Sequence, residues 1–282
     1  MQRLAPEKGF AGFASARKVA ETMTVAQARR HYSDMGAVLQ EYGLNFNFAP
    51  CVDLDGDPPC EVIGKLARSY GDSPRTVTDY ARAMIDGLAD HGVLSCLKHY
   101  PGHGRAQGDS HMGLVDITRT WRAVELAPFE TLVKEGRVDA VMTAHLIHNG
   151  VDPNTPPTFS GTWIGKLRRE IGFQGVVVAD DLHMGAILHH YTLKQIVIQG
   201  LGAGLDLLLF SNNPLAAKAL GIRQDARSTV LREASVPDAE LPEKIIETIV
   251  AALSAGALSA DVIDHAFARV VALKRRLNNG RA

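Results

Sequence analysis

The amino-acid sequence predicts an α/β fold in which parallel strands are joined by crossover helices. Short apolar runs rich in β-branched residues alternate along the chain with segments of helical periodicity, which is typical of a parallel sheet. The length of 282 residues suits one large α/β domain over residues 1–282. A composition of 46% hydrophobic and 22% charged residues is that of an ordinary globular protein.

Five segments are predicted as strands, and each is a short apolar run: 44–53, 92–97, 138–145, 175–180 and 205–210. Four of them end at or just before a polar residue suited to a functional site, namely Asp53, His99, His145 and Asp180. Active sites of parallel barrels lie at the carboxyl ends of the strands, so these side chains are expected to converge. A closed (β/α)8 barrel needs eight strands, so five leave it incomplete.

Helices are predicted between these strands. The segment 28–42 has one apolar face, and Ser73 with Pro74 is typical of the N-cap and first position of the next helix. Ser160 can cap a further helix. The segment 261–277 is amphipathic and ends in a basic last turn.

Charge and cysteine content exclude several classes of partner. A formal net charge of -1 gives no support for a nucleic-acid interface. No stretch is long and apolar enough to span a bilayer, and the N-terminus lacks a signal-peptide core. Cys51, Cys60 and Cys96 lack the spacing of a metal site and are expected to be reduced thiols. We therefore expect a cytoplasmic protein with no nucleic-acid or membrane partner.

The segment 98–111, KHYPGHGRAQGDSH, is the strongest candidate for a functional site. It brings three histidines, one lysine and one aspartate together after a buried strand. Its glycine and proline residues exclude a helix, so these side chains lie on a loop with a fixed path. Binding and catalytic residues concentrate on such loops when a rigid scaffold carries them.

Asp109 and His111 within this segment form a candidate acid–base pair. A carboxylate that holds one ring nitrogen of a histidine leaves the other oriented for proton transfer near neutral pH. At a separation of two residues the side chains can face each other only in a turn. The alternative is a solvated aspartate and histidine that merely shape that turn.

A second candidate is the acidic pair that follows the apolar run 176–179. Two adjacent buried carboxylates repel each other and are costly to desolvate, so stability alone does not explain them. Side chains alternate along an extended chain, so one of Asp180 and Asp181 is expected to face the barrel mouth. That residue could be a nucleophile, a metal ligand or a hydrogen-bond acceptor, and the other an N-cap of the following turn.

Two further interpretations stay open. Arg68 could hold an anionic or hydroxyl-rich ligand, or could simply be solvated. A metal site is the alternative for the histidines, although Pro101 and Gly102 exclude the helical spacing that such sites often use. Its ligands would be drawn from the following set: His99, His103, His145, Asp180, Asp181 and His183.

Together these segments resemble glycoside hydrolase family 3, specifically the single-domain β-N-acetylglucosaminidases of peptidoglycan recycling. The matching motifs, in chain order, are FAPCVDLD (48–55), RSYGDSP (68–74), KHYPGHG (98–104), GDSH (108–111), VMTAH (141–145), GFQGVVVADDLHM (172–184) and AGLDLLLFSNN (203–213). The resemblance implies a TIM-type (β/α)8 barrel with neither cofactor nor metal. It also implies a small carbohydrate substrate, such as an N-acetylglucosaminyl muropeptide.

The resemblance further implies a retaining mechanism with a covalent intermediate on Asp180. His111 would protonate the leaving oxygen and later activate water, with Asp109 orienting the ring. The residues that would contact the substrate are Lys98, His99, Arg68, Arg3, Asp53 and His145.

The sequence departs from the family at its start. Family members carry roughly sixty more residues there, which supply the first barrel strands and a sugar-binding aspartate. We therefore expect the first strands to be missing, through a misassigned start codon or a real truncation. Two unpaired sheet edges and an open apolar interior would follow. An inactive or sugar-binding remnant, a metal-dependent hydrolase, and phosphorolysis in place of hydrolysis remain alternatives.

Overall fold

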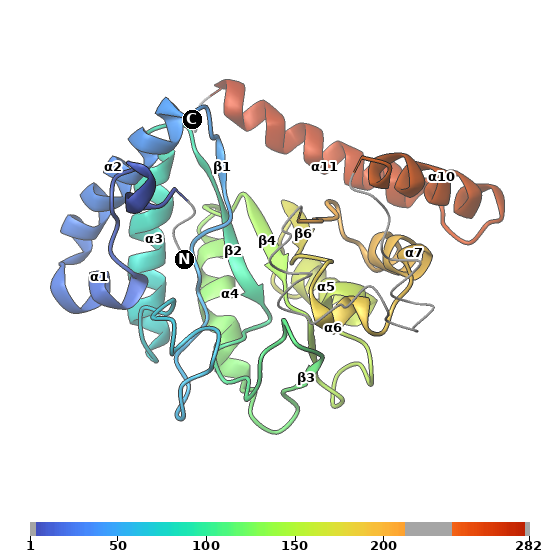
Figure 1. Ribbon diagram of the computed structural model, residues 1–282, viewed down its shortest axis with the longest axis horizontal. Coiled ribbons are helices and arrows are strands. Elements are labelled where there is room, and N and C mark those ends of the chain that lie inside the picture. Colours follow the sequence, from blue (N-terminus) through green and yellow to red (C-terminus); the bar gives the residue numbers. More distant parts are fainter. Residues whose placement is uncertain (1–3, 212–238, 280–282) are drawn as a thin grey trace.

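The computed structural model describes residues 4–211 and 239–279 (Figure 1). Its central sheet has four parallel strands in the order β1 (Phe46–Asn47), β2 (Leu94–Tyr100), β4 (Ala140–Thr143) and β6 (Val176–Ala179). A bridge between Val178 and Leu207 adds a fifth extended segment beside β6. Four of the five predicted strand segments therefore contain strands of one parallel sheet, and the fifth, 205–210, joins it through a single parallel bridge. Two short strands, β3 (Val115–Asp116) and β5 (Leu146–Ile147), pair separately.

Helices precede and follow these strands in the predicted order. The α-helices are α1 (Ala16–Thr22), α2 (Val25–Glu41), α3 (Pro74–Ala89), α4 (Ala127–Lys134), α5 (Gly161–Arg169), α6 (Gly185–Leu188), α7 (Leu193–Ala203), α10 (Leu241–Ser254) and α11 (Ala260–Asn279). Single 3₁₀ turns are η1 (Pro6–Lys8), η2 (Ala123–Leu126) and η3 (Pro157–Phe159). The predicted caps are confirmed, because Ser73 Oγ accepts from Thr76 N–H and Ser160 Oγ from Trp163 N–H. None of the helices within residues 4–211 and 239–279 is long and apolar enough to span a membrane.

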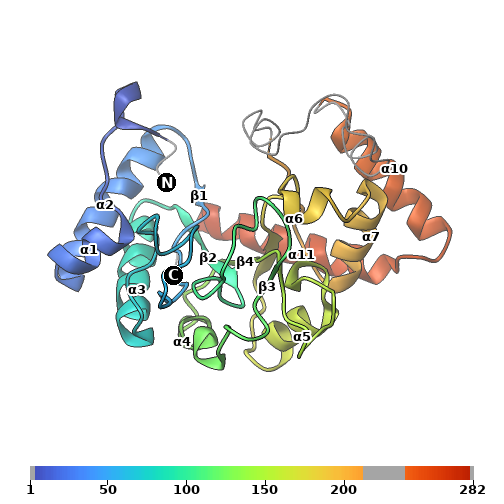
Figure 2. The same ribbon diagram turned by 60° about the horizontal axis from the view of Figure 1, so that its bottom comes forward.

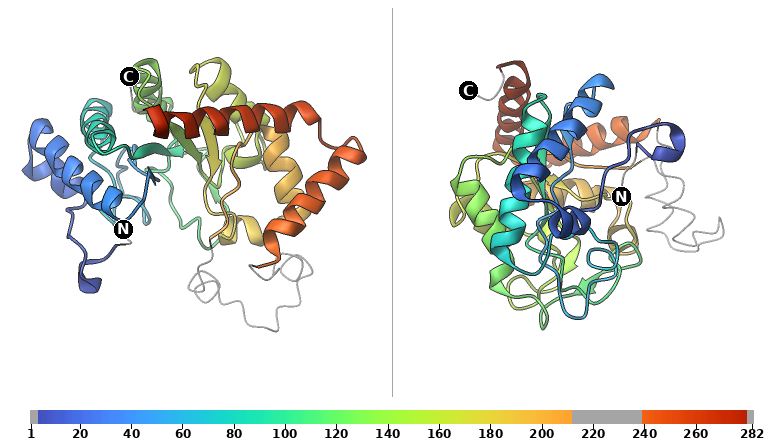
Figure 3. Two further views of the ribbon diagram at one scale, coloured as in Figure 1. Left: turned by 90° about the horizontal axis from the view of Figure 1, so that it is seen from above. Right: turned by 90° about the vertical axis from the view of Figure 1, so that its left-hand side faces the viewer.

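The sheet is covered on both faces. Leu97, Val141 and Val177 pack in one apolar cluster with residues of α3, α4 and α5. Their strand neighbours point to the opposite face, as expected for alternating side chains, and pack against α11. This second cluster contains Leu94, Cys96, Ala140, Met142, Val176, Val178 and, from α11, Val270, Leu273 and Leu277. Figure 3 shows α11 running across the strands.

The described strands thus form a sheet with α3, α4 and α5 on one face and α11 across the other. The sequence did not indicate that α11 would cover this face. Two ion pairs fasten this helix to the sheet. Arg269 Nε donates to Asp206 Oδ1 at 2.8 Å, and Arg276 Nη2 lies 3.1 Å from Asp139 Oδ1.

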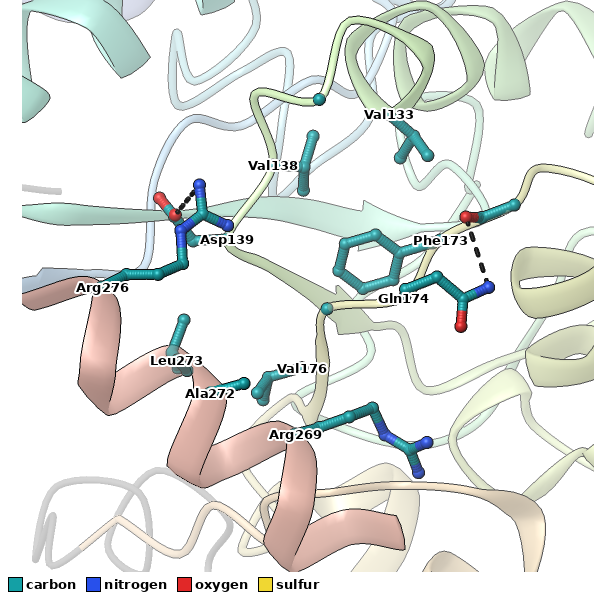
Figure 4. A pocket seen from close by; sticks show the side chains of 13 residues that line it. Val133, Val138, Asp139, Phe173, Gln174, Val176, Arg269, Ala272, Leu273 and Arg276 are labelled. Atoms are coloured by element: carbon teal, nitrogen blue, oxygen red, sulfur yellow. Dashed lines mark hydrogen bonds and ion pairs between the residues drawn. The ribbon is translucent and has the colours of Figure 1, made fainter. Parts of the chain in front are cut away.

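A pocket of about 330 Å³ lies between α11 and the segments that lead into β4 and β6 (Figure 4). Phe173 and Val138 line its apolar wall, and Asp139 with Arg276 closes one end. The pocket is at the amino ends of the strands. The predicted site residues that the structure describes do not line this pocket.

Candidate active site

The predicted site residues gather at the carboxyl ends of the strands, which come forward in Figure 2. Lys98 and His99 are near the end of β2, and Asp180 directly follows β6. The chain after β1 continues beside β2, where Val52 N–H donates to Lys98 O at 2.8 Å and so places Asp53 under His99. The predicted convergence of these strand ends is confirmed.

Asp53, His99 and Arg68 form a buried chain of hydrogen bonds. Asp53 Oδ2 lies 2.7 Å from His99 Nδ1, and Arg68 Nη2 lies 3.1 Å from His99 Nε2. A guanidinium can only donate, so Nε2 must accept and the proton of a neutral His99 must lie on Nδ1. The aspartate therefore fixes both the tautomer and the orientation of the ring.

The ionisation states of this chain are consistent with that tautomer. Burial lowers the pKa of His99 to about 4, so the ring is neutral at pH 7. Burial alone would raise the pKa of Asp53, but His99 and the hydrogen bonds that the carboxylate accepts hold it below its ordinary value. Those bonds come from the backbone N–H groups of His99 and His103, the His99 ring and the Cys51 thiol. An ionised carboxylate thus holds a neutral imidazole.

The Asp180 carboxylate is partly accessible, with 21% of its side chain exposed. Burial would raise its pKa, but His99, His145, the Asp181 N–H and Lys98 together hold it below the ordinary value. The His99 Nε2 atom is 3.9 Å from Asp180 Oδ2. Burial lowers the pKa of Lys98, while the negative charge of Asp180 acts in the opposite direction. An ionised, partly exposed carboxylate beside a lysine is suited to nucleophilic attack.

Asp181 points away from this cluster and supports the turn after β6. Its Oδ1 accepts from the backbone N–H groups of His183 and Ser211, both at 3.0 Å, and its Oδ2 accepts from the Ser211 hydroxyl. The expectation that the two acids face different environments, one of them capping a turn, is confirmed.

His145 is 1% exposed, and both of its ring nitrogens are used within the protein. Nε2 donates to Asp181 O at 3.1 Å, since a carbonyl can only accept, and Nδ1 lies 2.8 Å from Thr158 Oγ1. Burial lowers the pKa of His145. This geometry places the ring as a support for the acidic turn, and a direct substrate contact through its nitrogens stays a prediction.

The Asp109–His111 pair forms in a turn, as the spacing requires. His111 Nδ1 is 2.7 Å from Asp109 Oδ1, and the same oxygen accepts from the His111 backbone N–H at 2.8 Å. The side chains are 58% and 40% exposed. Gly185 N–H donates to His111 O at 3.1 Å, so the turn is attached to the start of α6, which follows Asp180. No described residue bonds to His111 Nε2, which leaves this nitrogen available for a ligand.

The predicted site residues differ in how far they are exposed to solvent. Asp180, Lys98 and Arg68 are half-buried, and the Asp109–His111 pair is exposed, so all five can meet a ligand. Asp53, His99 and His145 are buried beneath them. Arg3 lies outside the described residues.

Two buried residues near the site were not assigned there from the sequence. His103, considered only as a metal ligand, is 3% exposed and bonds through its backbone to Asp53. Glu125 is 1% exposed beneath Gly102, where an added Cβ would lie 2.6 Å from Glu125 Oε2. Gly102 in the PGHG motif is the sequence feature that could have indicated the buried Glu125, because a glycine permits this close approach.

The histidines expected for a metal site are not assembled as one. Within residues 4–211 and 239–279, the group with metal-ligand spacing is Cys51, Asp53 and His99. These atoms are bonded to one another, with Cys51 Sγ 3.1 Å from Asp53 Oδ2. A metal would have to replace those bonds, and His183 Nδ1 is already bonded to Ser211 O. The donor set fits an imidazole-orienting role better than a metal centre.

Comparison with protein-family models matches residues 3–273 to the glycosyl hydrolase family 3 N terminal domain. The Beta-hexosaminidase LpqI of Mycobacterium tuberculosis is 35% identical over 268 residues, which cover 92% of this chain and 62% of the relative. The Beta-hexosaminidase of Alkalilimnicola ehrlichii is 39% identical over 203 residues, covering 69% of this chain and 57% of the relative. The chain therefore spans about three-fifths of the length of these relatives.

Solved structures of similar sequence share the fold. That of M. tuberculosis LpqI matches with a TM-score of 0.79 at 34% identity and covers 97% of this chain and 74% of its own. A glycosyl hydrolase of the GH3 family from Mycobacterium smegmatis matches with a TM-score of 0.78 at 33% identity, covering 96% and 78%. The predicted TIM-barrel-type α/β fold is thereby confirmed.

Proposed function

The chain belongs to the family of the glycosyl hydrolase family 3 N-terminal domain, and we propose that it is a retaining exo-β-N-acetylglucosaminidase. The observation that carries the proposal is the 2.7 Å hydrogen bond between Asp109 and His111, on a turn attached to the segment that follows Asp180. It provides an oriented imidazole whose Nε2 has no partner among the described residues, on a turn bonded to the segment that follows Asp180. Relatives named Beta-hexosaminidase support the same class of reaction.

In the first step a carboxylate oxygen of Asp180 attacks the anomeric carbon of the terminal sugar. The bond from that carbon to the leaving oxygen breaks, and the protonated His111 gives its Nε2 proton to this oxygen. Asp109 accepts from Nδ1–H and stabilises the imidazolium before transfer. The products are a glycosyl ester on Asp180, a neutral His111 and the released alcohol.

In the second step the neutral His111 takes a proton from water through Nε2. The water oxygen attacks the anomeric carbon, and the bond to Asp180 breaks to restore the carboxylate. Two displacements return the original configuration of the sugar. The exposed position of His111 admits the water that this step consumes.

Lys98 and Arg68 are proposed to hold the sugar. Both cations are half-buried and lie in the electrostatic field around Asp180 and His99. Their donors suit the hydroxyl and acetamide oxygens of N-acetylglucosamine. The proposed substrates are fragments of bacterial cell wall with a terminal N-acetylglucosamine. The three cysteines are free and buried, which agrees with the proposed cytoplasmic location.

The test uses a chromogenic β-N-acetylglucosaminide. Asp180→Asn should reduce turnover at least about 10⁴-fold, because an amide is a poor nucleophile. Asp181→Asn should retain activity, since an amide oxygen can still accept from the backbone of the turn. A 2-fluoro sugar with a good leaving group should label Asp180 covalently, detected by peptide mass spectrometry.

Three results would contradict the proposal: labelling of another residue, full activity of Asp180→Asn, or a product of inverted configuration by NMR. Addition of phosphate supplies the decisive control for the second step. Release of a sugar 1-phosphate in place of the free sugar would show phosphorolysis.

A further inference from the structure

The residue between the two members of the acid–base pair is buried. Asp109 and His111 expose 40% and 58% of their side chains, whereas Ser110 is only 2% exposed. Its hydroxyl oxygen lies 3.1 Å from Nε2 of His103, which is itself 3% exposed. The turn therefore presents two side chains to solvent and inserts the third into the protein.

His103 is a rigid partner for this hydroxyl. Its backbone N–H donates to Asp53 Oδ1 at 2.8 Å, and the Cys60 thiol lies 3.7 Å from its Nδ1. Its ring meets that of His99 edge to face, with centroids 5.8 Å apart. Because burial lowers the pKa of His103, the ring is neutral and offers one donor and one acceptor. The thiol and the hydroxyl can satisfy either tautomer.

The turn 109–112 is otherwise held through its backbone. Ala186 N–H donates to Ser110 O at 3.3 Å, and Gly185 N–H donates to His111 O at 3.1 Å. Met112 N–H closes the turn on Asp109 O at 3.0 Å. In the described part of the chain, the Ser110–His103 bond is the side-chain hydrogen bond that joins this turn to the rest of the protein.

We propose that the Ser110–His103 hydrogen bond positions the Asp109–His111 pair relative to Asp180. Ser110 and His103 are thus positioning residues, and the inference rests on the proposed function. Proton transfer requires the His111 nitrogen within hydrogen-bond reach of the leaving oxygen, so a small displacement of an exposed turn affects this step first. Sugar binding, which involves Lys98 and Arg68, should change little.

Ser110→Ala tests this with two aryl β-N-acetylglucosaminides that differ in leaving group. For a phenol of high pKa, which needs protonation, kcat/KM should fall about 10–100-fold. For a dinitrophenol, which leaves without a proton, the first step should change less than about threefold. The inhibition constant of free N-acetylglucosamine should stay constant. Ser95→Ala is the matched control, because Ser95 is equally buried but bonds to Asp139 at the amino end of the sheet.

A double-mutant cycle separates positioning from general damage. In a His111→Ala background, Ser110→Ala should cause no further loss on the substrate with the poor leaving group, since its effect passes through His111. His103→Gln, whose amide can still reach Ser110, should retain more of this activity than His103→Ala. An equal loss on both substrates, or a loss of the same size in the His111→Ala background, would overturn the inference while leaving the proposed function intact.

Hydrogen exchange gives a readout that does not depend on turnover. The amides of His111 and Met112 should exchange about tenfold faster in Ser110→Ala and at an unchanged rate in Ser95→Ala. Unchanged exchange in both variants would refute the positioning role. Absence of hexosaminidase activity in the unaltered protein would instead refute the proposed function, so the two failures are distinguishable.

Discussion

Glu125→Gln should stabilise the protein at alkaline pH, because the structure buries this acid without enough partners for its charge. Among the described residues Glu125 Oε2 has no hydrogen-bond partner, and Oε1 accepts from the Arg122 backbone N–H at the long distance of 3.4 Å. The backbone N–H groups of Arg122 and Gly104 lower the pKa of Glu125, but by less than burial raises it. Arg105 Nε stands 3.9 Å from Oε1, and the negative Asp53 acts on the same group. Burial, reinforced by Asp53, raises the pKa of Glu125 from 4.5 to about 8. The folded protein therefore holds this side chain neutral at pH 7.

The sign of the effect follows from linkage. The pKa is higher in the folded than in the unfolded chain, so the stabilising contribution of the bound proton is complete below pH 4.5. It is lost progressively as the pH rises and is gone once the pH exceeds about 8. Each pKa unit between the folded and the unfolded value corresponds to about 1.4 kcal/mol, so the whole loss of unfolding free energy is at most about 5 kcal/mol. Between pH 6 and pH 8 it amounts to roughly 2 kcal/mol.

The assay is urea unfolding of the unaltered protein and of Glu125→Gln at pH 6 and pH 8. Glutamine has the size of the neutral acid and does not ionise. The difference in unfolding free energy between the two proteins should therefore shift by roughly 2 kcal/mol in favour of glutamine over this range. The buried histidines titrate alike in both proteins, so their contributions to the pH dependence of the unfolding free energy cancel in the difference. Glu61→Gln, on the exposed surface, should shift by less than about 0.5 kcal/mol. A difference that is constant with pH would show Glu125 to be ionised at pH 6 and would refute the reasoning.

Two further predictions concern the scaffold. Asp206→Asn should lower the free energy of unfolding by about 3–5 kcal/mol, because it leaves two arginines around a wholly buried position without their carboxylate. Asp90→Asn, in an exposed ion pair, should cost less than about 1 kcal/mol in the same urea titration, and equal losses would contradict the argument. Gly104→Ala should abolish soluble folded protein, since its Cβ would lie 1.6 Å from Leu54 O. Gly113→Ala, whose Cβ would meet no described residue within 4 Å, should fold normally by circular dichroism, and a folded Gly104→Ala would refute the close approach.

The sheet could be predicted from the sequence because its strands are buried on both faces. Such strands are continuous apolar runs, and the run 176–179 is entirely buried in the structure. The partner of that second face could not be predicted. An amphipathic helix such as α11 shows that one side is apolar but not which surface it covers.

Within the site, the sequence predicted the ionisable residues that are proposed to react. It did not predict that Ser110, His103 and Glu125 are buried next to the loops of the site. Asp180 and the Asp109–His111 pair follow from strand ends and from the geometry of a turn. Ser110 and His103 meet across seven positions of an irregular loop, where no periodicity relates side-chain directions. Glu125 lies at the start of a helical segment, where an acidic residue is ordinarily solvated and favoured by the helix dipole. Its burial depends on the path of the loop that contains Gly102.

Asp53 connects the two halves of the segment 98–111. It is ionised, its side chain is wholly buried, and its hydrogen bonds reach the backbone of both His99 and His103. Through the His99 ring it fixes the surroundings of Arg68 and Asp180, where the sugar is proposed to bind. Through His103 it fixes the atom that holds Ser110, and with it the turn that carries His111. One buried carboxylate therefore holds residues in both the proposed sugar-binding half and the proposed proton-transfer half of this segment. Because the carboxylate does not contact solvent, its electrostatic effect acts on these neighbours rather than on the surrounding water.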